Sequence, residues 1–370
     1  YDGEAENLPE EPFDDVRLLF VDIELNTQGQ TDKNKASKVI GVIRKIIGES
    51  CFPYIMILWT HHNEIAGLVE DGLKCKPVIL KEMEKQDFLD EDGQISINKI
   101  EDKLSEWRRE SNALDILSTW EGLVGHAAGL TVNEFSSFFE FDNDWNKRMN
   151  KMFLDMAKAH SGKSLDPDDL VESALLTFNS LFIDILERSI KKEVTGMNQI
   201  NADDTASGIE HIGKINARLH LYIPNDNLII PGNIYKDDDP EINLQDYFSN
   251  GTTQDFGKIT HILVEASPVC DYAQKKWRLS RIIPGFLCPY EKLRNLKKTT
   301  EYLYCSPLLF IYGGLYKIVL DLRYFSSVKF EFLKNRKPDY TIRNLLLAQI
   351  QNSISRHVNR LGLLFLDEKV

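Results

Sequence analysis

Three short apolar runs near the start of the chain constrain its fold most. They are "VRLLFVDI" from residue 16, "FPYIMILWT" from residue 52 and "KPVILK" from residue 76. Continuous apolar runs of this length are typical of parallel strands that are covered on both faces. The segments between them, "ASKVIGVIRKIIG" and "HHNEIAGLVEDGLK", have the pattern of helices. The alternation predicts right-handed crossovers and a parallel sheet, which is an α/β fold.

The rest of the chain changes character twice. Long amphipathic helices are expected over residues 94–200. A polar, glycine-rich stretch, "GMNQINADDTASGIEHIGK", begins at residue 196 and has the composition of a linker. Beyond it, short strand-like runs such as "ARLHLYIP" and "HILVEASPV" alternate with turns, and one helix closes the chain. We therefore expect an α/β domain at 1–93, a helical region at 94–200 and a β-rich C-terminal domain at 201–370.

Composition narrows the class of protein. The chain has 57 acidic against 44 basic residues and a net charge of −13, which argues against broad binding to nucleic acid or anionic membranes. No apolar run reaches the roughly 18 residues that a transmembrane helix needs. The five cysteines are widely spaced without a CxxC pair, and the acidic first residues carry no signal-peptide pattern. These features predict reduced thiols and a cytoplasmic location.

Each of the three apolar runs finishes on a residue that can do chemistry. The runs end at Asp22, Thr60 and Lys81. Because the carboxyl ends of parallel strands meet at one edge of a sheet, we expect these side chains to converge. A carboxylate can accept a phosphoryl group as an acyl phosphate, while a hydroxyl and an ammonium stabilise the phosphoryl oxygens. The trio predicts a phosphoacceptor site.

This arrangement resembles the receiver domain of two-component response regulators, a flavodoxin-like fold. In that family an acceptor Asp follows the third strand, a Thr or Ser the fourth and a Lys the fifth. The resemblance implies that Asp22 is the phosphoacceptor, Thr60 the switch hydroxyl and Lys81 the phosphate partner. It also implies a Mg²⁺ ion bound by Asp22 and by the backbone carbonyl of Glu24. The partner that it implies is a histidine kinase or phosphotransfer protein.

The resemblance covers about residues 16–90 and departs from the family in one respect. Receiver domains carry an acidic pair after their first strand, which holds the Mg²⁺, and no strand with such a pair precedes Asp22 here. Asp14 and Asp15 stand too close to the first apolar run to play that part. Two alternatives follow: the first strands are missing from this chain, or this receiver lacks its metal site. A pseudo-receiver that binds partners without phosphorylation is an intermediate case. The absence of a methionine at Tyr1 favours the first.

A different enzyme class fits the same stretch. "FVDIE" is similar to the first motif of DEDD-type 3′–5′ exonucleases, in which Asp22 and Glu24 would bind metal ions. Such an enzyme needs further acids, and His160 with Asp166 in "AHSGKSLD" is the candidate pair. The spacing is unusual, and a helix-like segment follows Asp22 where that family has a β-hairpin. The metal-dependent nuclease is therefore kept as an alternative.

The C-terminal domain contains one distinctive segment, "HILVEASPVCDYAQKKWRLSRIIPGFLCP". It resembles segments of bacterial proteins found beside receiver domains in phage-defence operons, including the phosphorelay system called Detocs. This resemblance implies a signalling role in antiviral defence and carries no mechanism. We do not expect this domain to be an enzyme.

Two further features of the C-terminal domain bear on binding. Residues 275–298 hold eight basic residues against one acid, Glu291, so this basic patch could bind a nucleotide, nucleic acid or the acidic half of the chain. Cys270 and Asp271 stand at a strand end. The cysteines of this domain are expected to be buried free thiols. The alternative is a zinc site whose ligands would be Cys270, Cys288 and Cys305 with either His220 or His261.

Overall fold

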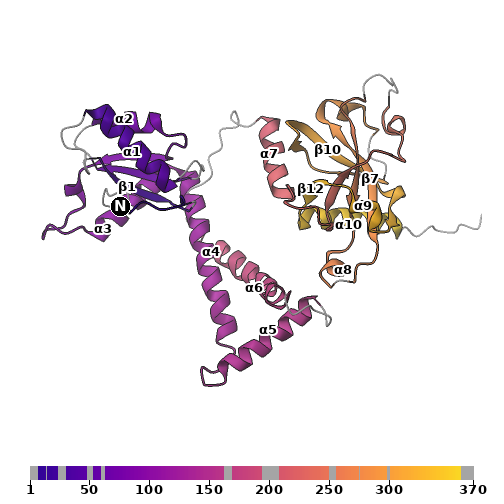
Figure 1. Cartoon of the computed structure of the whole chain (residues 1–370), viewed down its shortest axis with the longest axis horizontal. Helices are drawn as coiled ribbons and strands as arrows, with labels where there is room; N and C mark the ends of the chain where they lie inside the picture. The colour runs from indigo at the N-terminus through magenta and orange to yellow at the C-terminus, as the bar shows by residue number, and fades with distance from the viewer. Residues whose placement is uncertain are drawn as a thin grey trace, which may run out of the picture. The chain divides into compact units, whose positions relative to one another are not determined.

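The computed structural model divides the chain into two units (Figure 1). Unit 1 comprises Tyr1–Phe135 and Phe182–Ile200, and unit 2 comprises Ser136–Leu181 and Asn201–Val370. The residues that the structure describes are 7–13, 15–23, 31–47, 53–59, 63–161, 169–193, 208–249, 256–274, 276–297 and 301–359. No helix in these ranges combines the length and the apolar character that crossing a membrane requires.

Unit 1 contains the parallel sheet that the apolar runs predict. Its strands are β1 (Leu18–Asp22), β2 (Ile55–Trp59) and β3 (Ile79–Met83), in the spatial order β1-β2-β3. In sequence, α1 (Asp32–Ile47) lies between β1 and β2, and α2 (Asn63–Gly72) lies between β2 and β3. All pairings are parallel, so the carboxyl ends of the three strands form a single edge of the sheet.

Long helices follow the sheet, as expected for the region at 94–200. They are α3 (Ile97–Glu110), α4 (Asn112–Ser136), α5 (Trp145–Ser161) and α6 (Leu170–Glu193). Ser96 starts α3 as an N-cap, because its side chain accepts a hydrogen bond from the backbone of Lys99. The boundary between the two units falls within α6, so the helical region does not form a unit of its own.

Helices cover both faces of the parallel sheet. On one face, Met56 belongs to an apolar cluster that includes Ile43 of α1 and residues of α2. On the opposite face, Ile57 clusters with Trp107 of α3 and Leu114 of α4. Side chains alternate between the faces along each strand, which explains why the strands read as unbroken apolar runs.

Unit 2 is built on a nine-stranded sheet whose pairings are all antiparallel. The main path runs β4-β12-β5-β6-β7-β10-β8, with β11 paired to β7 and β9 paired to β10. The strands are β4 (Leu221–Tyr222), β5 (Asn233–Lys236), β6 (Thr260–Glu265), β7 (Ser280–Pro289), β8 (Leu303–Cys305), β9 (Leu309–Ile311), β10 (Gly314–Asp321), β11 (Ser326–Val328) and β12 (Pro338–Ile342). This confirms a β-rich C-terminal region.

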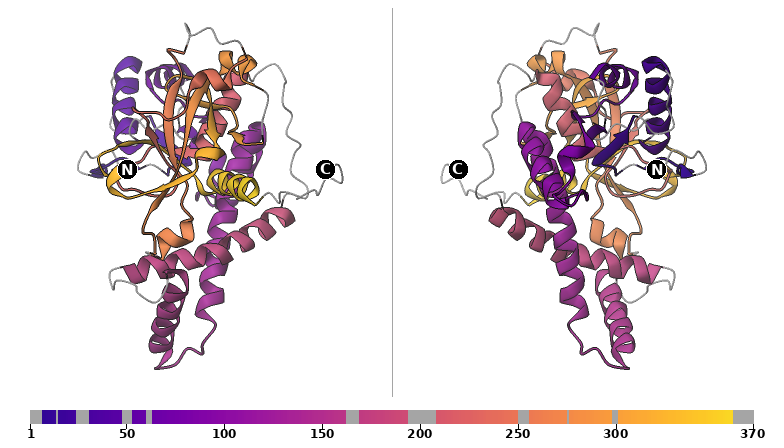
Figure 2. Two further views of the ribbon diagram at one scale, coloured as in Figure 1. Left: turned by 90° about the vertical axis from the view of Figure 1, so that its right-hand side faces the viewer. Right: turned by 90° about the vertical axis from the view of Figure 1, so that its left-hand side faces the viewer.

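Several helices accompany this sheet in the described part of unit 2. The α-helices are α7 (Ile209–His220), α8 (Val269–Ala273), α9 (Glu331–Lys334) and α10 (Asn344–Val358). The 3₁₀ helices are η4 (Leu244–Tyr247), η5 (Tyr290–Asn295) and η6 (Leu322–Tyr324). Helix α10, the expected closing helix, packs on the sheet (Figures 1 and 2), where its buried Ile350 joins the cluster that contains Val264 and Ile318.

One predicted strand in unit 2 is largely helical. "ARLHLYIP" alternates in polarity like a strand, but α7 continues to His220 and β4 is only two residues long. The close approach of α7 to the sheet explains the difference. A Cβ atom at Gly213 would lie 2.3 Å from a methyl of Leu315 and 3.4 Å from the backbone nitrogen of Phe310. Tertiary packing of this helix therefore overrides the local alternation.

Candidate phosphoacceptor edge

Asp22 ends β1 at the carboxyl edge of the parallel sheet. The strand register aligns it with Trp59 on β2, which in turn is aligned with Met83 on β3. The Asp22 side chain is 17% exposed, and the next residue, Ile23, is fully buried. The Asp22 carboxylate therefore lies at the edge of the sheet with part of its surface open to solvent.

A lysine that the sequence reasoning missed lies on this carboxylate. The Nζ atom of Lys85 is 2.5 Å from Oδ2 of Asp22. Lys85 begins η2 (Lys85–Phe88), just after β3, and a capping box between Glu84 and Asp87 fixes the start of that turn. The same ammonium lies 5.5 Å from the centre of the Trp59 ring. Lys85 is thus placed by a defined turn and by an aromatic face.

Lys81, the lysine expected at this site, makes a different contact. Strand β3 extends to Met83, so Lys81 lies two residues before the strand end and is aligned with Ile57. Its ammonium donates to both carboxylate oxygens of Glu110 at the end of α3, at 2.8 and 2.7 Å. By strand alternation Lys81 and Asp22 share the α3 side of the sheet. Two lysine–carboxylate pairs therefore occupy this face.

The remaining residues predicted for this site lie outside the described residues. These are Thr60, which directly follows β2, and Glu24, which is two places after Asp22. Of the nuclease candidates, Asp166 is also outside the described part, whereas His160 lies in the last turn of α5 in unit 2 and its Nδ1 lies 3.0 Å from the hydroxyl of Ser161. The structure therefore tests neither the switch hydroxyl nor the second metal ligand.

The described residues do not by themselves fit a magnesium site. Mg²⁺ is usually held by one or two carboxylates together with water and phosphate. At this edge Asp22 is paired with the ammonium of Lys85. Within the described ranges no group of three or more His, Cys, Asp or Glu side chains could hold a metal ion.

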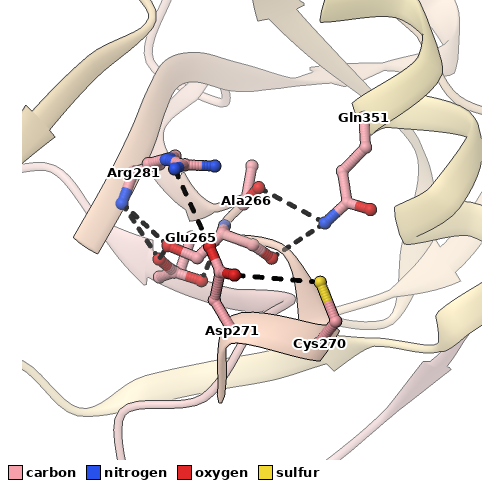
Figure 3. Close-up of polar contacts among 7 residues, drawn as sticks. Glu265, Ala266, Cys270, Asp271, Arg281 and Gln351 are labelled. Carbon is pink, nitrogen blue, oxygen red and sulfur yellow. Dashed lines mark hydrogen bonds and ion pairs between the residues drawn. The ribbon is translucent and has the colours of Figure 1, made fainter. Parts of the chain in front are cut away.

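The cysteine–aspartate pair of unit 2 lies on α8, at the surface (Figure 3). The Cys270 thiol is exposed and lies 3.8 Å from Oδ1 of Asp271. The other oxygen of Asp271 is 3.8 Å from a guanidinium nitrogen of Arg281 on β7. Both contacts are at the limit of an interaction.

A buried acid next to this pair was missed from the sequence. Glu265, the last residue of β6, is fully buried and accepts hydrogen bonds from the backbone N–H groups of Ser267 and Arg281, both at 3.1 Å, and from the Ser267 hydroxyl. Burial raises the pKa of Glu265 to about 7, although these donors oppose the shift. Gln351 of α10 secures the same loop by donating to the carbonyls of Ala266 and Ser267 (Figure 3). "HILVEAS", an apolar run ending on an acid, is the signal that could have revealed it.

Three of the cysteines that the structure describes are free thiols. Cys270, Cys288 and Cys305 are free, and the absence of a three-ligand cluster within the described residues gives the zinc alternative no support. Burial raises the pKa of Cys288 to about 12. Cys75, however, is disulfide-bonded, which corrects the expectation of reduced thiols throughout. The backbone N–H of Val78 donates to the carbonyl of Tyr54, so the loop that holds Cys75 lies beside the start of β2. Sequence spacing does not reveal this proximity.

Three cations of the basic segment at 275–298 have side-chain contacts in the described part of the chain. Its described part runs through a loop, β7 and η5. The ammonium of Lys297 donates to the backbone carbonyl of Asp246 at 2.6 Å, that of Lys276 donates to Gln274 at 2.6 Å, and Arg281 lies near Asp271. Of these contacts, the one between Arg281 and Asp271 joins opposite charges, and whether the segment binds a partner stays a prediction.

Comparisons with known proteins return nothing for this chain: no protein-family model, no curated protein and no solved structure matches it. The resemblance to receiver domains therefore rests on the sequence motifs alone.

Proposed function

We propose that unit 1 is a receiver-like module in which Asp22 accepts a phosphoryl group from a histidine kinase or a phosphotransfer protein. The observation that carries the proposal is a partly exposed carboxylate at the carboxyl edge of a parallel sheet, with a lysine ammonium 2.5 Å away. Ligand sites of open α/β sheets lie at this edge. The strand order β1-β2-β3 agrees with the last three strands of a flavodoxin-like receiver sheet.

The chemistry needs only a nucleophilic carboxylate and a group that offsets charge. An Asp22 oxygen attacks the phosphorus of a phosphohistidine, the P–N bond breaks, and the departing nitrogen takes up a proton. The product is an acyl phosphate, which adds negative charge at the sheet edge. The Lys85 ammonium is placed to stabilise that charge in the transition state and in the product.

The two lysines are assigned different roles in this proposal. Lys85 is the phosphate partner, because it is the lysine on the acceptor carboxylate. Lys81 supports the site by fixing the end of α3 through Glu110. Thr60 as switch hydroxyl, Mg²⁺ as cofactor and a setting in a phage-defence phosphorelay remain predictions from the sequence resemblance.

A pseudo-receiver that binds partners without phosphorylation is the second candidate. It is favoured by the Lys85–Asp22 pair together with the lack of a metal-binding cluster among the described residues. A carboxylate held by a built-in cation has less need of a divalent ion. The nuclease alternative gains no comparable support, since the described residues contain no group of three or more His, Cys, Asp or Glu side chains that could hold a metal ion.

Phosphoryl labelling separates these candidates. The full chain is incubated with phosphoramidate, a small donor with a P–N bond, with and without Mg²⁺, and the phosphorylated fraction is resolved by phosphate-affinity electrophoresis. We expect labelling that is sensitive to hydroxylamine, absent in Asp22→Asn and unchanged in Asp71→Asn, an exposed acid on α2. Labelling that persists in Asp22→Asn would place the acceptor elsewhere. No labelling of the wild type would favour the pseudo-receiver, and Mn²⁺-dependent loss of single-stranded DNA would favour the nuclease.

A further inference from the structure

A pocket of about 450 Å³ lies in unit 1, on the α3 and α4 side of the sheet. Leu18 and Ile55, which begin β1 and β2, line it together with Leu104 of α3 and Leu114 of α4. It is therefore at the amino ends of the strands, at the edge opposite Asp22. Its volume is within the range of roughly 300–1,000 Å³ that is usual for small-molecule sites. The inference below does not rest on the proposed phosphoacceptor role.

The lining is mostly apolar, and its charged groups are of two kinds. Arg17 and Glu121 form a two-bond fork, with Nε–Oε2 at 3.0 Å and NH2–Oε1 at 3.1 Å. This pair largely cancels its own charge. Leu117, also in the lining, is 51% exposed, which leaves apolar surface at the mouth of the pocket.

Arg108 is the residue of the lining that has a buried side-chain atom without a hydrogen-bond partner. One terminal nitrogen of its guanidinium donates to Asp115 at 3.0 Å and lies 3.4 Å from the Thr119 hydroxyl. Its Nε–H is buried without an acceptor. A buried donor that lacks a partner is unfavourable, and an acceptor atom brought in by a ligand would remove that penalty.

We propose that this pocket binds a small molecule with an apolar body and one anionic hydrogen-bond acceptor, such as a carboxylate or sulfonate, that pairs with Arg108. The apolar body would cover Leu18, Ile55 and Leu104, and the acceptor would accept a hydrogen bond from the guanidinium of Arg108. Arginine suits planar oxyanions because its donors form a fixed fork. Glu101 also lines the pocket, and its negative charge opposes the anion.

The test uses a dye that has this chemistry, 8-anilinonaphthalene-1-sulfonate, with the full chain. Its uncharged analogue N-phenyl-1-naphthylamine has the same rings without the sulfonate and serves as the matched probe. Binding is followed by dye fluorescence in titrations of the wild type and of Arg108→Met, Ser118→Phe and Lys103→Met. Ser118 lines the pocket and hydrogen-bonds within α4, so a phenyl group there fills space. Lys103 is not in the lining and pairs with Glu106.

We expect saturable binding of the sulfonate at one site, weakened about tenfold or more in Arg108→Met, since a hydrogen bond to a charged group is lost. Ser118→Phe should abolish that site, and Lys103→Met should leave it unchanged. Glu101→Gln should tighten binding about twofold by removing the like charge. The uncharged probe should bind the wild type more weakly and respond little to Arg108→Met.

Three results would overturn the proposal. The first is no saturable binding of the sulfonate to the wild type. The second is binding that is equal in the wild type, Arg108→Met and Ser118→Phe, which would place the dye elsewhere. The third is equal affinity of the two dyes, which would remove the role of the anion. Circular dichroism of each variant shows that it is folded, and Ser118→Phe tests the pocket without touching the Arg108–Asp115 pair.

Discussion

Replacing the buried acid of unit 2 should remove one component of the pH dependence of its stability. Glu265 is fully buried and its pKa is raised from a usual value near 4.5 to about 7, chiefly by burial. The folded state therefore holds a proton that the unfolded state releases at lower pH. Below pH 4.5 the carboxyl is protonated in both states. As pH rises through 7 the folded state must ionise a buried group, so stability falls.

The size of the effect follows from the shift. A difference of about 2.5 pKa units at about 1.4 kcal/mol per unit gives about 3 kcal/mol between pH 4.5 and pH 7.5. His261 acts in the opposite direction over part of this window, because burial lowers its pKa and its contribution to stability is lost as pH falls below 6.5. The comparison must therefore be made against Glu265→Gln, in which only the ionisation of Glu265 is removed.

Hydrogen exchange on β7 measures this difference directly. The peptide covering residues 282–288 is identical in the wild type and in Glu265→Gln, so its intrinsic exchange rate cancels at each pH. Exchange is read where opening is in rapid equilibrium, so that the ratio of rates reports the difference in opening free energy. From pH 4.5 to 7.5 the wild type should lose protection relative to the variant by roughly a hundredfold. Any constant cost of the introduced amide does not alter this slope.

Two outcomes would refute this account of Glu265. A ratio that does not change with pH would mean that the carboxyl has the same pKa in the folded and unfolded states. A wild type that gains protection with rising pH would mean that the donors of Ser267 and Arg281 outweigh burial. Glu331→Gln, at an exposed site on α9, is the matched control and should give a flat ratio.

Three further experiments test other contacts in the structure. Lys85→Ala should lower the rate of Asp22 labelling by roughly a hundredfold, which is the usual effect of losing one charge-stabilising donor. Lys81→Ala should lower the same rate less than tenfold. Rapid-quench labelling measures both rates. Gly285→Ala should destabilise unit 2 by about 3 kcal/mol or more in urea unfolding, because the new Cβ would lie 2.2 Å from a backbone oxygen of β10. Cys270 should react with a maleimide in the native protein and buried Cys288 only after unfolding, as peptide mass spectrometry would show.

The architecture of unit 1 could be predicted because its strands are local signals. Each of the runs that end at Asp22, Thr60 and Lys81 is apolar at every position that the sheet buries. The segments between these runs have apolar residues at helical spacing. The boundary of β3 could not be predicted, since "VILKEM" contains no turn residue that would end the strand at Lys81. The strand continues to Met83 because its backbone pairs with β2 up to Trp59.

The contacts of the candidate site depend on tertiary packing. Lys85 and Lys81 are equivalent cations in the sequence, and the turn that starts η2 decides which of them reaches Asp22. Glu110 could not be linked to Lys81 before the packing of α3 on the sheet was known. In unit 2 the acid that organises the loop before α8 is Glu265, whereas the sequence motif pointed to Cys270.

The central claim is that Asp22 carries the phosphoryl group, and reductive trapping tests it most directly. The full chain is treated with phosphoramidate and then with borohydride, which reduces an aspartyl phosphate to homoserine, and the product is mapped by tandem mass spectrometry. The proposal predicts homoserine at position 22, dependent on the donor and decreased in Lys85→Ala. Homoserine at another aspartate, or a phosphate on a residue that borohydride leaves intact, would contradict it.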